Sequence, residues 1–195
     1  MKKNLIFATN NRHKIDEDSA ILDGVCNISG LKEIGCFEDI PEEMDTIRGN
    51  AMQKARFIFE KYGFNCFADD TGLFVDSLDG EPGVYSARYA GEECDSQKNI
   101  DKLLDKLKDK TDRKALFKTV VALIIDGNEY YFEGVINGEI LSERHGDGGF
   151  GYDPVFMPEG FTQSFAQLGM DEKNKISHRA LAIKAMSDFL SSDLC

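Results

Sequence analysis

Four short segments of the chain carry side chains that could bind or cleave phosphate. The first, Thr9–Lys14, comes where an apolar run is expected to pass into a helix. The amides of a helix N-terminus, a hydroxyl, a carboxamide and a lysine together suit a phosphate chain. The segment lacks the glycines of a P-loop, and junctions rich in Asn and Thr often serve simply as helix caps. By itself it therefore indicates either a phosphate site or a cap.

Two adjacent aspartates, Asp69 and Asp70, follow the short apolar run Cys66–Ala68. In an extended chain their carboxylates point to opposite sides, so one can face a cleft while the other holds the loop. Mg²⁺ prefers one or two carboxylates together with phosphate oxygens and waters, which makes this pair a candidate metal site. Glu42, in the acidic segment Glu38–Asp45, is a candidate second ligand. The alternatives are a solvated turn and an ordinary acidic surface, because Asp and Gly also favour turns.

The glycine-rich segment Gly146–Asp153, GDGGFGYD, is the third candidate. It matches G-x-G-x-x-G formally, but Pro154 follows and no helix is expected to open there, so a dinucleotide-binding turn is excluded. Glycines let the backbone approach a flat ligand, and the ring of Phe150 or Tyr152 can stack on it. Asp153 is then a candidate acceptor for hydrogen bonds from a base edge. The alternative is a tight loop that packs its aromatic rings on the core.

The fourth segment, Lys173–Arg179, places His178 and Arg179 at the expected start of the last helix. Their side chains donate hydrogen bonds and suit a keto oxygen or a phosphate. The alternative for a lone histidine in such a polar run is an ordinary surface position.

The elements that must position these segments can be predicted from hydrophobic periodicity and turn signals. Strands are expected at Leu5–Ala8, Cys66–Ala68, Ala115–Ile125, Tyr130–Ile136 and Glu139–Ser142. Helices are expected over about Arg12–Leu22, over Asn50–Lys61 with Gly63 as its stop, from an N-cap at Asp95 or Ser96 to Leu107, and from an N-cap at Ser177 to Leu190. Turn signals at Asp126–Asn128 and at Asn137-Gly138 indicate an antiparallel meander. Together these elements predict a single α/β domain over residues 1–195 with a mixed sheet.

Composition excludes several classes of partner. The formal net charge is −12, and an acidic surface repels a polynucleotide backbone, so no DNA or RNA partner is expected. A small polyanion is not excluded, because a few lysines in a cleft, with a metal, can reverse the local field. No apolar run approaches the roughly 18–20 residues that span a bilayer, so no membrane partner is expected. The five cysteines have no C-x-x-C or metal-ligand spacing, which indicates reduced thiols and a cytoplasmic protein.

Six motifs taken together resemble one known family. In chain order they are TNNRHK, PEEMDTIRGNAMQKA, FADDTGL, EPGVYSARYAG, GGFGYDPVF and EKNKISHRALA, spread from Lys3 to about Leu190. This order closely resembles the inosine triphosphate pyrophosphatases, also called dITP/XTP or non-standard purine NTP pyrophosphatases. Each motif is moderately specific, and their common order over nearly the whole chain carries the resemblance.

The resemblance implies a role for each matching residue. Asp70 matches the general base and, with Glu42, the metal-binding acids, while Asp69 and Arg88 match supporting positions. The residues that match substrate contacts are Thr9, Asn10, Asn11, Arg12, His13, Lys14, Thr71, Phe150, Gly151, Tyr152, Asp153, Lys173, His178 and Arg179. Of these, Lys14 and Lys173 are expected to stabilise a pyrophosphate leaving group, and His178 or Arg179 to donate to a 6-keto oxygen. The loop that carries Glu42 varies in length, and the adjacent Glu43 is the alternative to Glu42 as the metal-binding acid.

The resemblance also implies the fold, the reaction and the assembly. The expected fold is an elongated mixed α/β sheet with flanking helices, in two lobes around a central nucleotide-binding cleft. The expected reaction is Mg²⁺-dependent hydrolysis of dITP, ITP and XTP to the monophosphate and pyrophosphate, with Mn²⁺ as a substitute ion. The expected assembly is a homodimer.

Two other functions stay open at this point. One is an NTP pyrophosphatase of the septum-inhibitor type, which prefers pyrimidine substrates; GGFGYDP and SHR argue against it. The other is a non-catalytic nucleotide sensor using the same residues. The retained acids Glu42, Asp69 and Asp70 argue against a sensor, because a sensor needs no group that activates water.

Overall fold

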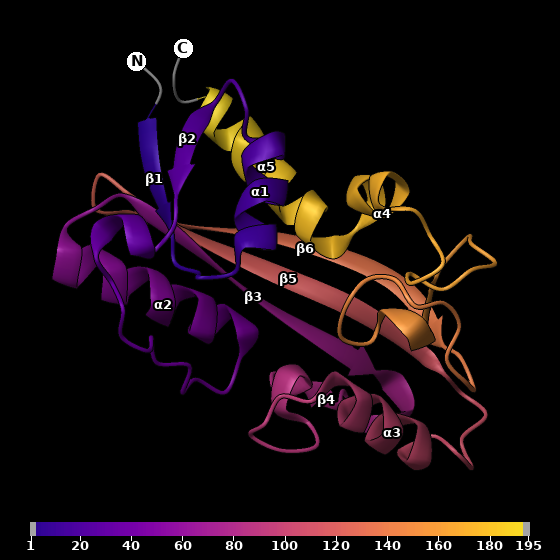
Figure 1. Cartoon of the computed structure of the whole chain (residues 1–195). Helices are drawn as coiled ribbons and strands as arrows, with labels where there is room; N and C mark the ends of the chain where they lie inside the picture. The colour runs from indigo at the N-terminus through magenta and orange to yellow at the C-terminus, as the bar shows by residue number, and fades with distance from the viewer. Residues whose placement is uncertain (1–2, 193–195) are drawn as a thin grey trace. The chain divides into compact units, whose positions relative to one another are not determined.

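The computed structural model describes residues 3–192, apart from the side chains of His13, Met170, Asp171 and Asn174. The strands are β1 (Lys3–Phe7), β2 (Cys26–Ser29), β3 (Cys66–Val75), β4 (Pro82–Gly83), β5 (Lys114–Ile125), β6 (Asn128–Ile140) and β7 (Phe156–Pro158). The α-helices are α1 (Arg12–Ile21), α2 (Ile47–Tyr62), α3 (Ser96–Lys106), α4 (Met170–Ile176) and α5 (His178–Ser192) (Figure 1). No helix within the described residues is both long and apolar enough to cross a membrane.

The strands form one mixed sheet in the order β2-β1-β3-β5-β6-β7, with β4 pairing to β3. β1 runs parallel to β2 and β3, whereas β4 and β7 are antiparallel to their neighbours. The expected α/β class with a mixed sheet is therefore confirmed. The chain divides into two compact units: unit 1 is Met1–Asp70, Thr119–Gly134 and Arg179–Cys195, and unit 2 is Thr71–Lys118 and Val135–His178.

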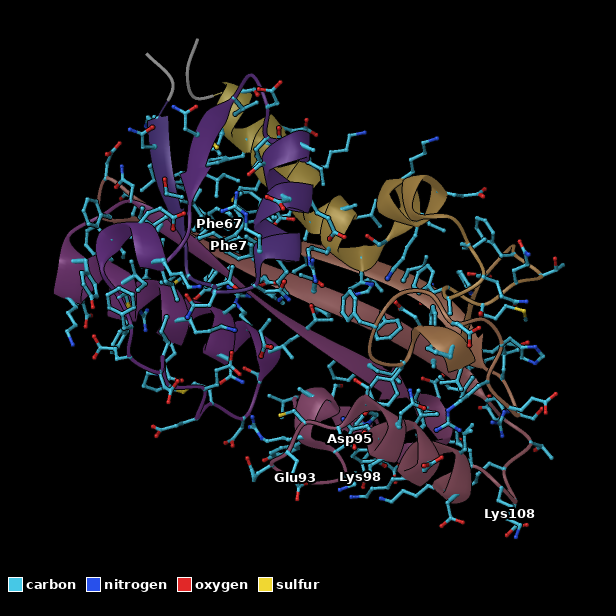
Figure 2. The ribbon with its side chains drawn as sticks, viewed as in Figure 1. Phe7, Phe67, Glu93, Asp95, Lys98 and Lys108 are labelled. Carbon is cyan, nitrogen blue, oxygen red and sulfur yellow. The ribbon has the colours of Figure 1, made fainter. Side chains whose placement is uncertain are left out.

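Unit 1 is built on the alternation of side chains along β1 and β3. Phe7 pairs with Phe67 across these parallel strands, and their rings stack with centroids 4.4 Å apart (Figure 2). On this face the strands pack against apolar residues of α1 and α5 (Figure 1). The opposite face of β3 meets α2, where the Cys66 thiol lies 3.1 Å from the carbonyl of Ala55. Each face of β3 is thus covered by different helices.

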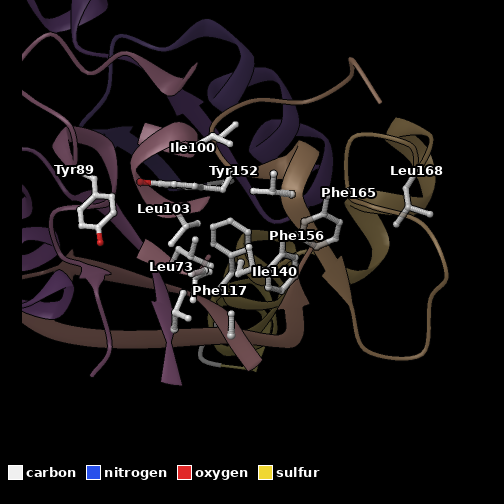
Figure 3. Packing of buried hydrophobic residues seen from close by; sticks show 14 residues of the cluster. Leu73, Tyr89, Ile100, Leu103, Phe117, Ile140, Tyr152, Phe156, Phe165 and Leu168 are labelled. Carbon is white, nitrogen blue, oxygen red and sulfur yellow. The ribbon is translucent and has the colours of Figure 1, made fainter. Parts of the chain in front are cut away.

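Unit 2 has a core of its own, rich in aromatic rings (Figure 3). α3 contributes Ile100 and Leu103, both fully buried. Its first turn is capped by Asp95, whose carboxylate accepts hydrogen bonds from the amides of Gln97 and Lys98, at 2.8 and 3.2 Å. This confirms the predicted cap. Tyr152 lies in the same core, with its ring among these residues in Figure 3.

The prediction of a short strand that ends at Ala68 is wrong. β3 continues from Cys66 to Val75, so the two aspartates lie within a strand instead of on a turn. Position 72 of this strand is a glycine because β4 passes close to it: a Cβ at this position would lie 2.7 Å from the carbonyl oxygen of Gly83. The glycine permits a close backbone approach, which the sequence pattern does not distinguish from a turn.

The predicted turn at Asn137-Gly138 is wrong for the same reason. β6 is continuous from Asn128 to Ile140, so β5 and β6 form a long hairpin and not a three-stranded meander. Gly138 pairs with Pro158 of β7, and a Cβ there would lie 2.3 Å from the carbonyl oxygen of Met157. An interior strand glycine here again marks a close neighbour.

α2 begins earlier than predicted, at Ile47 and not at Asn50. Thr46 is its N-cap and accepts a hydrogen bond from the amide of Gly49 at 3.0 Å. The predicted stop is confirmed, because Gly63 ends the helix in the left-handed conformation with φ of 72°. The earlier start places Asn50 in the first turns of the helix, where its side chain can reach the strand below.

Candidate active site

The predicted site residues form two sets, one on each unit. Unit 1 carries Thr9, Asn10, Asn11, Arg12, His13, Lys14, Glu42, Asp69, Asp70 and Arg179. Unit 2 carries Thr71, Arg88, Phe150, Gly151, Tyr152, Asp153, Lys173 and His178. The side chain of His13 lies outside the described residues.

The turn between β1 and α1 is held by its own polar side chains. The amide of Asn11 donates to the hydroxyl of Thr9 at 3.2 Å, and the carboxamide oxygen of Asn11 accepts from the amide of Lys14 at 3.4 Å. Asn11 is therefore positioned as an N-cap of α1. The cap and the phosphate-binding interpretation are compatible, because the capped turn fixes the direction in which the Lys14 side chain leaves the helix.

Asp69 is buried beneath that turn and pairs with cations from two helices. The ammonium of Lys14 lies 3.0 and 2.8 Å from its two carboxylate oxygens, and Nε of Arg179 lies 3.5 Å from Oδ2. Burial acts to raise the pKa of Asp69, but the charges of Lys14 and Arg179 outweigh it and hold the pKa well below its ordinary value. Asp69 is thus ionised and holds both cations in place.

Asp70, the next residue, faces the other side of β3. Its Oδ2 accepts a hydrogen bond from the carboxamide of Asn50 on α2 at 3.1 Å. This alternation follows from the period of two in a strand: Asp69 meets α1 and α5, and Asp70 meets α2. The expectation that the two carboxylates point to opposite sides matches these contacts, although they arise within a strand.

Glu42 makes an ion pair with a lysine that the sequence analysis did not single out. Lys54, one helical turn beyond Asn50 on α2, donates to Oε1 of Glu42. Burial acts to lower the pKa of Lys54, but the neighbouring carboxylates, first Asp70 and then Asp69 and Glu42, raise it above its ordinary value. The ammonium therefore stays charged among three acids.

Some of these unit 1 residues line a cavity of about 230 Å³, and Asp70 lies outside this lining. Its walls include the phosphate-motif residues Thr9, Asn10 and Lys14, the acids Glu42 and Asp69, and Lys54. The remaining wall comes from Ala8, Leu31, Glu38, Asp39 and Ile40. The structure thus brings the predicted phosphate motif and a predicted metal-binding acid to one cavity.

The acids of unit 1 suit a divalent cation whose coordination is completed by phosphate oxygens of the substrate. Within the described residues, no three histidine, cysteine or acidic side chains are placed to enclose a metal ion. Mg²⁺ does not need such a cage, because it keeps waters and takes phosphate oxygens beside one or two carboxylates. Lys54 pairs with Glu42, and the charge of Asp70 is the first of those that raise the Lys54 pKa, so the field of these acids favours a positive charge here. The residues therefore fit Mg²⁺.

A pair of variants tests which glutamate of the acidic segment acts. We expect Glu42→Gln to lower turnover by about 10-fold or more, since it removes a charge that would hold a cation. Glu43→Gln should leave turnover near the native value, because its backbone amide, which donates to Gln53 at 2.9 Å, is unchanged. Steady-state kinetics of both proteins check this, and equal effects would show that Glu42 is wrongly assigned.

On unit 2, Lys173, Asp153 and Phe150 form one contact cluster. Lys173 donates to Oδ2 of the buried Asp153 at 2.5 Å, and the same oxygen accepts the amide of Phe150 at 2.8 Å. The Lys173 ammonium lies 4.6 Å from the centre of the Phe150 ring, which is 61% exposed. Asp153 therefore closes the loop, and Lys173 supports the ring from below. These contacts favour a role for Lys173 at the loop over the expected role at the leaving group.

Tyr152 has a different place from Phe150. Its ring is buried, and its hydroxyl donates to the carbonyl of Ser86 at 2.8 Å. Gly151 between the two aromatics has φ of +59°, a value that suits glycine and lets consecutive rings point in different directions. Phe150 is thus the ring available for stacking, and Tyr152 anchors the loop.

His178 is buried against the aromatic core of unit 2. Its ring stacks on Phe117, with centroids 4.7 Å apart and planes inclined by 13°. Phe117 in turn packs against Phe156 at 4.6 Å. The alternative of an ordinary surface histidine is therefore excluded, and the orientation of the imidazole is set by this stack.

The other predicted residues make local contacts. Arg12 is exposed and lies 3.2 Å from Asp16, one turn along α1. The Arg88 guanidinium lies 5.3 Å from the centre of the Tyr85 ring, and Thr71 is half-buried in β3 beside Asp70.

Two acids of α1 were missed by the sequence analysis. Glu17 accepts from Nη1 of Arg179 at 3.1 Å. Asp18 is fully buried, and neither carboxylate oxygen has a hydrogen-bond partner among the described residues. Burial and then the charge of Asp69 raise the pKa of Asp18 to about 8. The weak amphipathic pattern of α1 concealed which of its acids point inward; the spacing Lys14–Asp18, i and i+4, was the available signal.

Comparison with known proteins identifies the family that this fold and these residues define. The family model described as the Ham1 family matches residues 5–189, and the chain belongs to this family. It is 58% identical to the dITP/XTP pyrophosphatase of Porphyromonas gingivalis, covering 95% of this chain and 96% of the relative. The solved Ham1 protein of Staphylococcus aureus superposes with a TM-score of 0.92 at 38% identity, covering 98% of this chain and 100% of that one. These relatives confirm the resemblance and the expected class of enzyme, a nucleoside-triphosphate pyrophosphatase.

Proposed function

We propose that the chain hydrolyses the non-standard purine nucleotides dITP, ITP and XTP to the monophosphate and pyrophosphate, and so cleanses the nucleotide pool. The observation that carries this proposal is the unit 1 cavity, where Lys14 and Lys54 lie with Asp69 and Glu42. Two lysines that suit a triphosphate and Glu42, an acid that suits Mg²⁺, line the same space. The names of the relatives support the substrate class.

The unit 1 residues are proposed to perform the cleavage. Lys14, oriented by the capped turn, and Lys54 neutralise the charge of the pyrophosphate as it leaves. Glu42 and Asp70 would hold Mg²⁺, with Mn²⁺ as a substitute, and the bound ion supplies charge neutralisation and polarisation of phosphate oxygens. Asp70 orients the attacking water and accepts its proton as the water approaches the α-phosphorus.

The unit 2 residues, together with Arg179 of unit 1, are proposed to recognise the base. Phe150 stacks on the purine, with the Lys173–Asp153 pair holding its loop. Hypoxanthine and xanthine carry a keto oxygen at C6, whereas adenine carries an amino group, so a donor from His178 or Arg179 meets an acceptor only in the former. An unmade buried hydrogen bond is costly, which favours deaminated purines over ATP.

Two His178 variants test this recognition separately from packing. His178→Phe keeps a ring to stack on Phe117 but removes the donors, and His178→Ala removes both. We expect each to reduce the ratio of kcat/KM for ITP to that for ATP by about 10-fold or more, because each removes the proposed hydrogen bond from His178 to the 6-keto oxygen. Steady-state kinetics with both nucleotides measure the ratio. A native ratio in His178→Phe would show that the imidazole packs the core without recognising the base.

A substrate panel tests the proposed function as a whole. Purified protein is assayed for pyrophosphate release from ITP, XTP, dITP, GTP, ATP and dTTP, with and without Mg²⁺. We expect release that needs the ion and is fastest with ITP, XTP and dITP. A preference for dTTP would favour the pyrimidine-specific alternative, and nucleotide binding without any pyrophosphate release would favour a sensor.

The place of action and the assembly belong to the same proposal. We infer that the chain acts in the cytoplasm, where the nucleotide pool lies, and as a homodimer, as the resemblance implies. Cys36 and Cys66 are buried and form no disulfide within the described part of the chain, which supports a reducing compartment. Size-exclusion chromatography with light scattering measures the assembly.

A further inference from the structure

The side chain of Asn50 is buried, and both ends of its carboxamide make hydrogen bonds. It lies on α2 and is 1% exposed. Its Oδ1 accepts the backbone amide of Met44 at 2.8 Å, and its Nδ2 donates to Oδ2 of Asp70 at 3.1 Å. One side chain therefore ties the end of the acidic segment to the candidate catalytic acid.

The direction of this carboxamide is unambiguous. A backbone amide only donates, so the oxygen of Asn50 must face Met44. The NH₂ group then necessarily faces Asp70. The donated hydrogen bond engages one chosen oxygen of Asp70, Oδ2, and restricts rotation of its carboxylate.

The helical spacing of α2 extends this connection to Glu42. Asn50 and Lys54 are four residues apart and so lie on one face of the helix. Asn50 contacts Asp70, and Lys54 contacts Glu42. α2 therefore presents one partner to each of the two acids that are proposed to bind the cation. Moving the Asn50 contact changes the placement of Asp70 relative to this face.

We propose that Asn50 is a positioning residue of the reaction: it orients the Asp70 carboxylate and fixes it to the acidic segment that carries Glu42. This inference rests on the proposed role of Asp70. A side chain that orients a metal-binding or catalytic group commonly contributes 10–100-fold in metal affinity or activity. The hydrogen bond to Asp70 is the contact through which Asn50 is proposed to act on the reaction.

Gln53 provides a matched control on the same helix. Its Oε1 accepts the backbone amide of Glu43 at 2.9 Å, next to the amide that Asn50 holds. Asn50→Ala and Gln53→Ala each remove one side-chain oxygen that accepts a backbone amide of the acidic segment. Asn50→Ala also removes the donor to Asp70. Asn50→Asp keeps an acceptor for Met44 and places a carboxylate against Asp70. It therefore retains the loop contact should Asn50→Ala fail to fold.

The experiment combines kinetics with ITP and Mn²⁺ binding followed by electron paramagnetic resonance without nucleotide. At saturating Mg²⁺ we expect kcat of Asn50→Asp to fall by about 10–100-fold while KM changes far less, because the nucleotide contacts are untouched. We expect Asn50→Ala to weaken Mn²⁺ binding by about 10-fold and Gln53→Ala to match the native protein. Equal effects of the two alanine variants, or a native kcat in Asn50→Asp, would overturn the inference.

Asp70→Asn in the same assays separates this inference from the proposed function. If Asp70→Asn keeps native turnover, the role of Asp70 fails and the inference fails with it. If Asp70→Asn is inactive while Asn50→Asp has native kcat, Asp70 acts without Asn50 and the inference alone is wrong.

Discussion

Replacing Asp70 by Asn is expected to lower kcat for ITP by a factor on the order of 10²–10⁴, the contribution of a general base. The Asn side chain has the same shape and can still accept the hydrogen bond from Asn50 through its carbonyl oxygen. What it loses is the negative charge that takes a proton from water and attracts a cation. Folding should therefore be largely retained while the chemical step fails.

Steady-state kinetics together with thermal unfolding measure both parts of this result. Asp45→Asn serves as the control, since it neutralises an exposed acid of the acidic segment and should leave both quantities near the native values. A folded Asp70→Asn protein with native turnover would remove Asp70 from the mechanism. If Asp70→Asn does not fold, Glu42→Gln tests the proposed metal site instead, because Glu42 is exposed and lies outside β3.

The second large effect concerns stability and originates at Asp18. Burial raises the pKa of this carboxyl to about 8 in the folded protein, from an ordinary value of 3.8. Between these two values the folded chain keeps a proton that the unfolded chain releases. The free energy of unfolding should therefore fall as pH rises through this window, by up to about 1.4 kcal/mol per pH unit. The stabilising effect of the proton is complete below the unfolded pKa and lost above the folded pKa.

Urea unfolding at a series of pH values between about 5 and 8 gives the free energy of unfolding at each pH, and so the slope that is predicted. Asp18→Asn cannot ionise, so the slope should become much smaller and the variant should be more stable than the native protein at the alkaline end. Asp16→Asn, which changes an exposed acid on the same helix, should retain the native slope. Native and Asp18→Asn proteins with the same slope would mean that Asp18 carries no proton in this range.

The class of fold was predictable because it rests on strong, local patterns. The apolar run of β5, the periodicity of α3 and the left-handed glycine after α2 all agree with their structures. The two errors in the strands share one cause. Gly72 and Gly138 were interpreted as turns, whereas each lies inside a strand under a close neighbouring backbone. That neighbour is distant in sequence, so no local pattern reveals it.

The candidate site was predictable where a residue's chemistry is visible from its neighbours along the chain. Asp69 and Asp70 could be assigned opposite directions from the alternation of a strand alone. Asn50 and Lys54 could not be found this way, because their significance lies in contacts across the fold, with Asp70 and with Glu42. A buried polar residue inside a helix resembles a surface one until its partners are known.

The contacts also changed the interpretation of residues that the resemblance grouped together. Tyr152 and Phe150 both belong to the predicted base loop, yet one is buried in the core and the other is exposed. Asp153 was expected to meet a base edge, and its Oδ2 is engaged by Lys173 and by the amide of Phe150. Tyr152 therefore anchors the loop and Phe150 is its exposed ring, a difference that the sequence of the loop did not indicate.

Hydrolysis of ITP in ¹⁸O-labelled water tests the central claim most directly, because it identifies the phosphorus atom that water attacks. Products are separated and their isotope content is measured by mass spectrometry. Attack at the α-phosphorus, with Asp70 as the base, predicts IMP that carries the label and pyrophosphate that carries none. Label in pyrophosphate, or formation of IDP and inorganic phosphate, would contradict the proposed reaction.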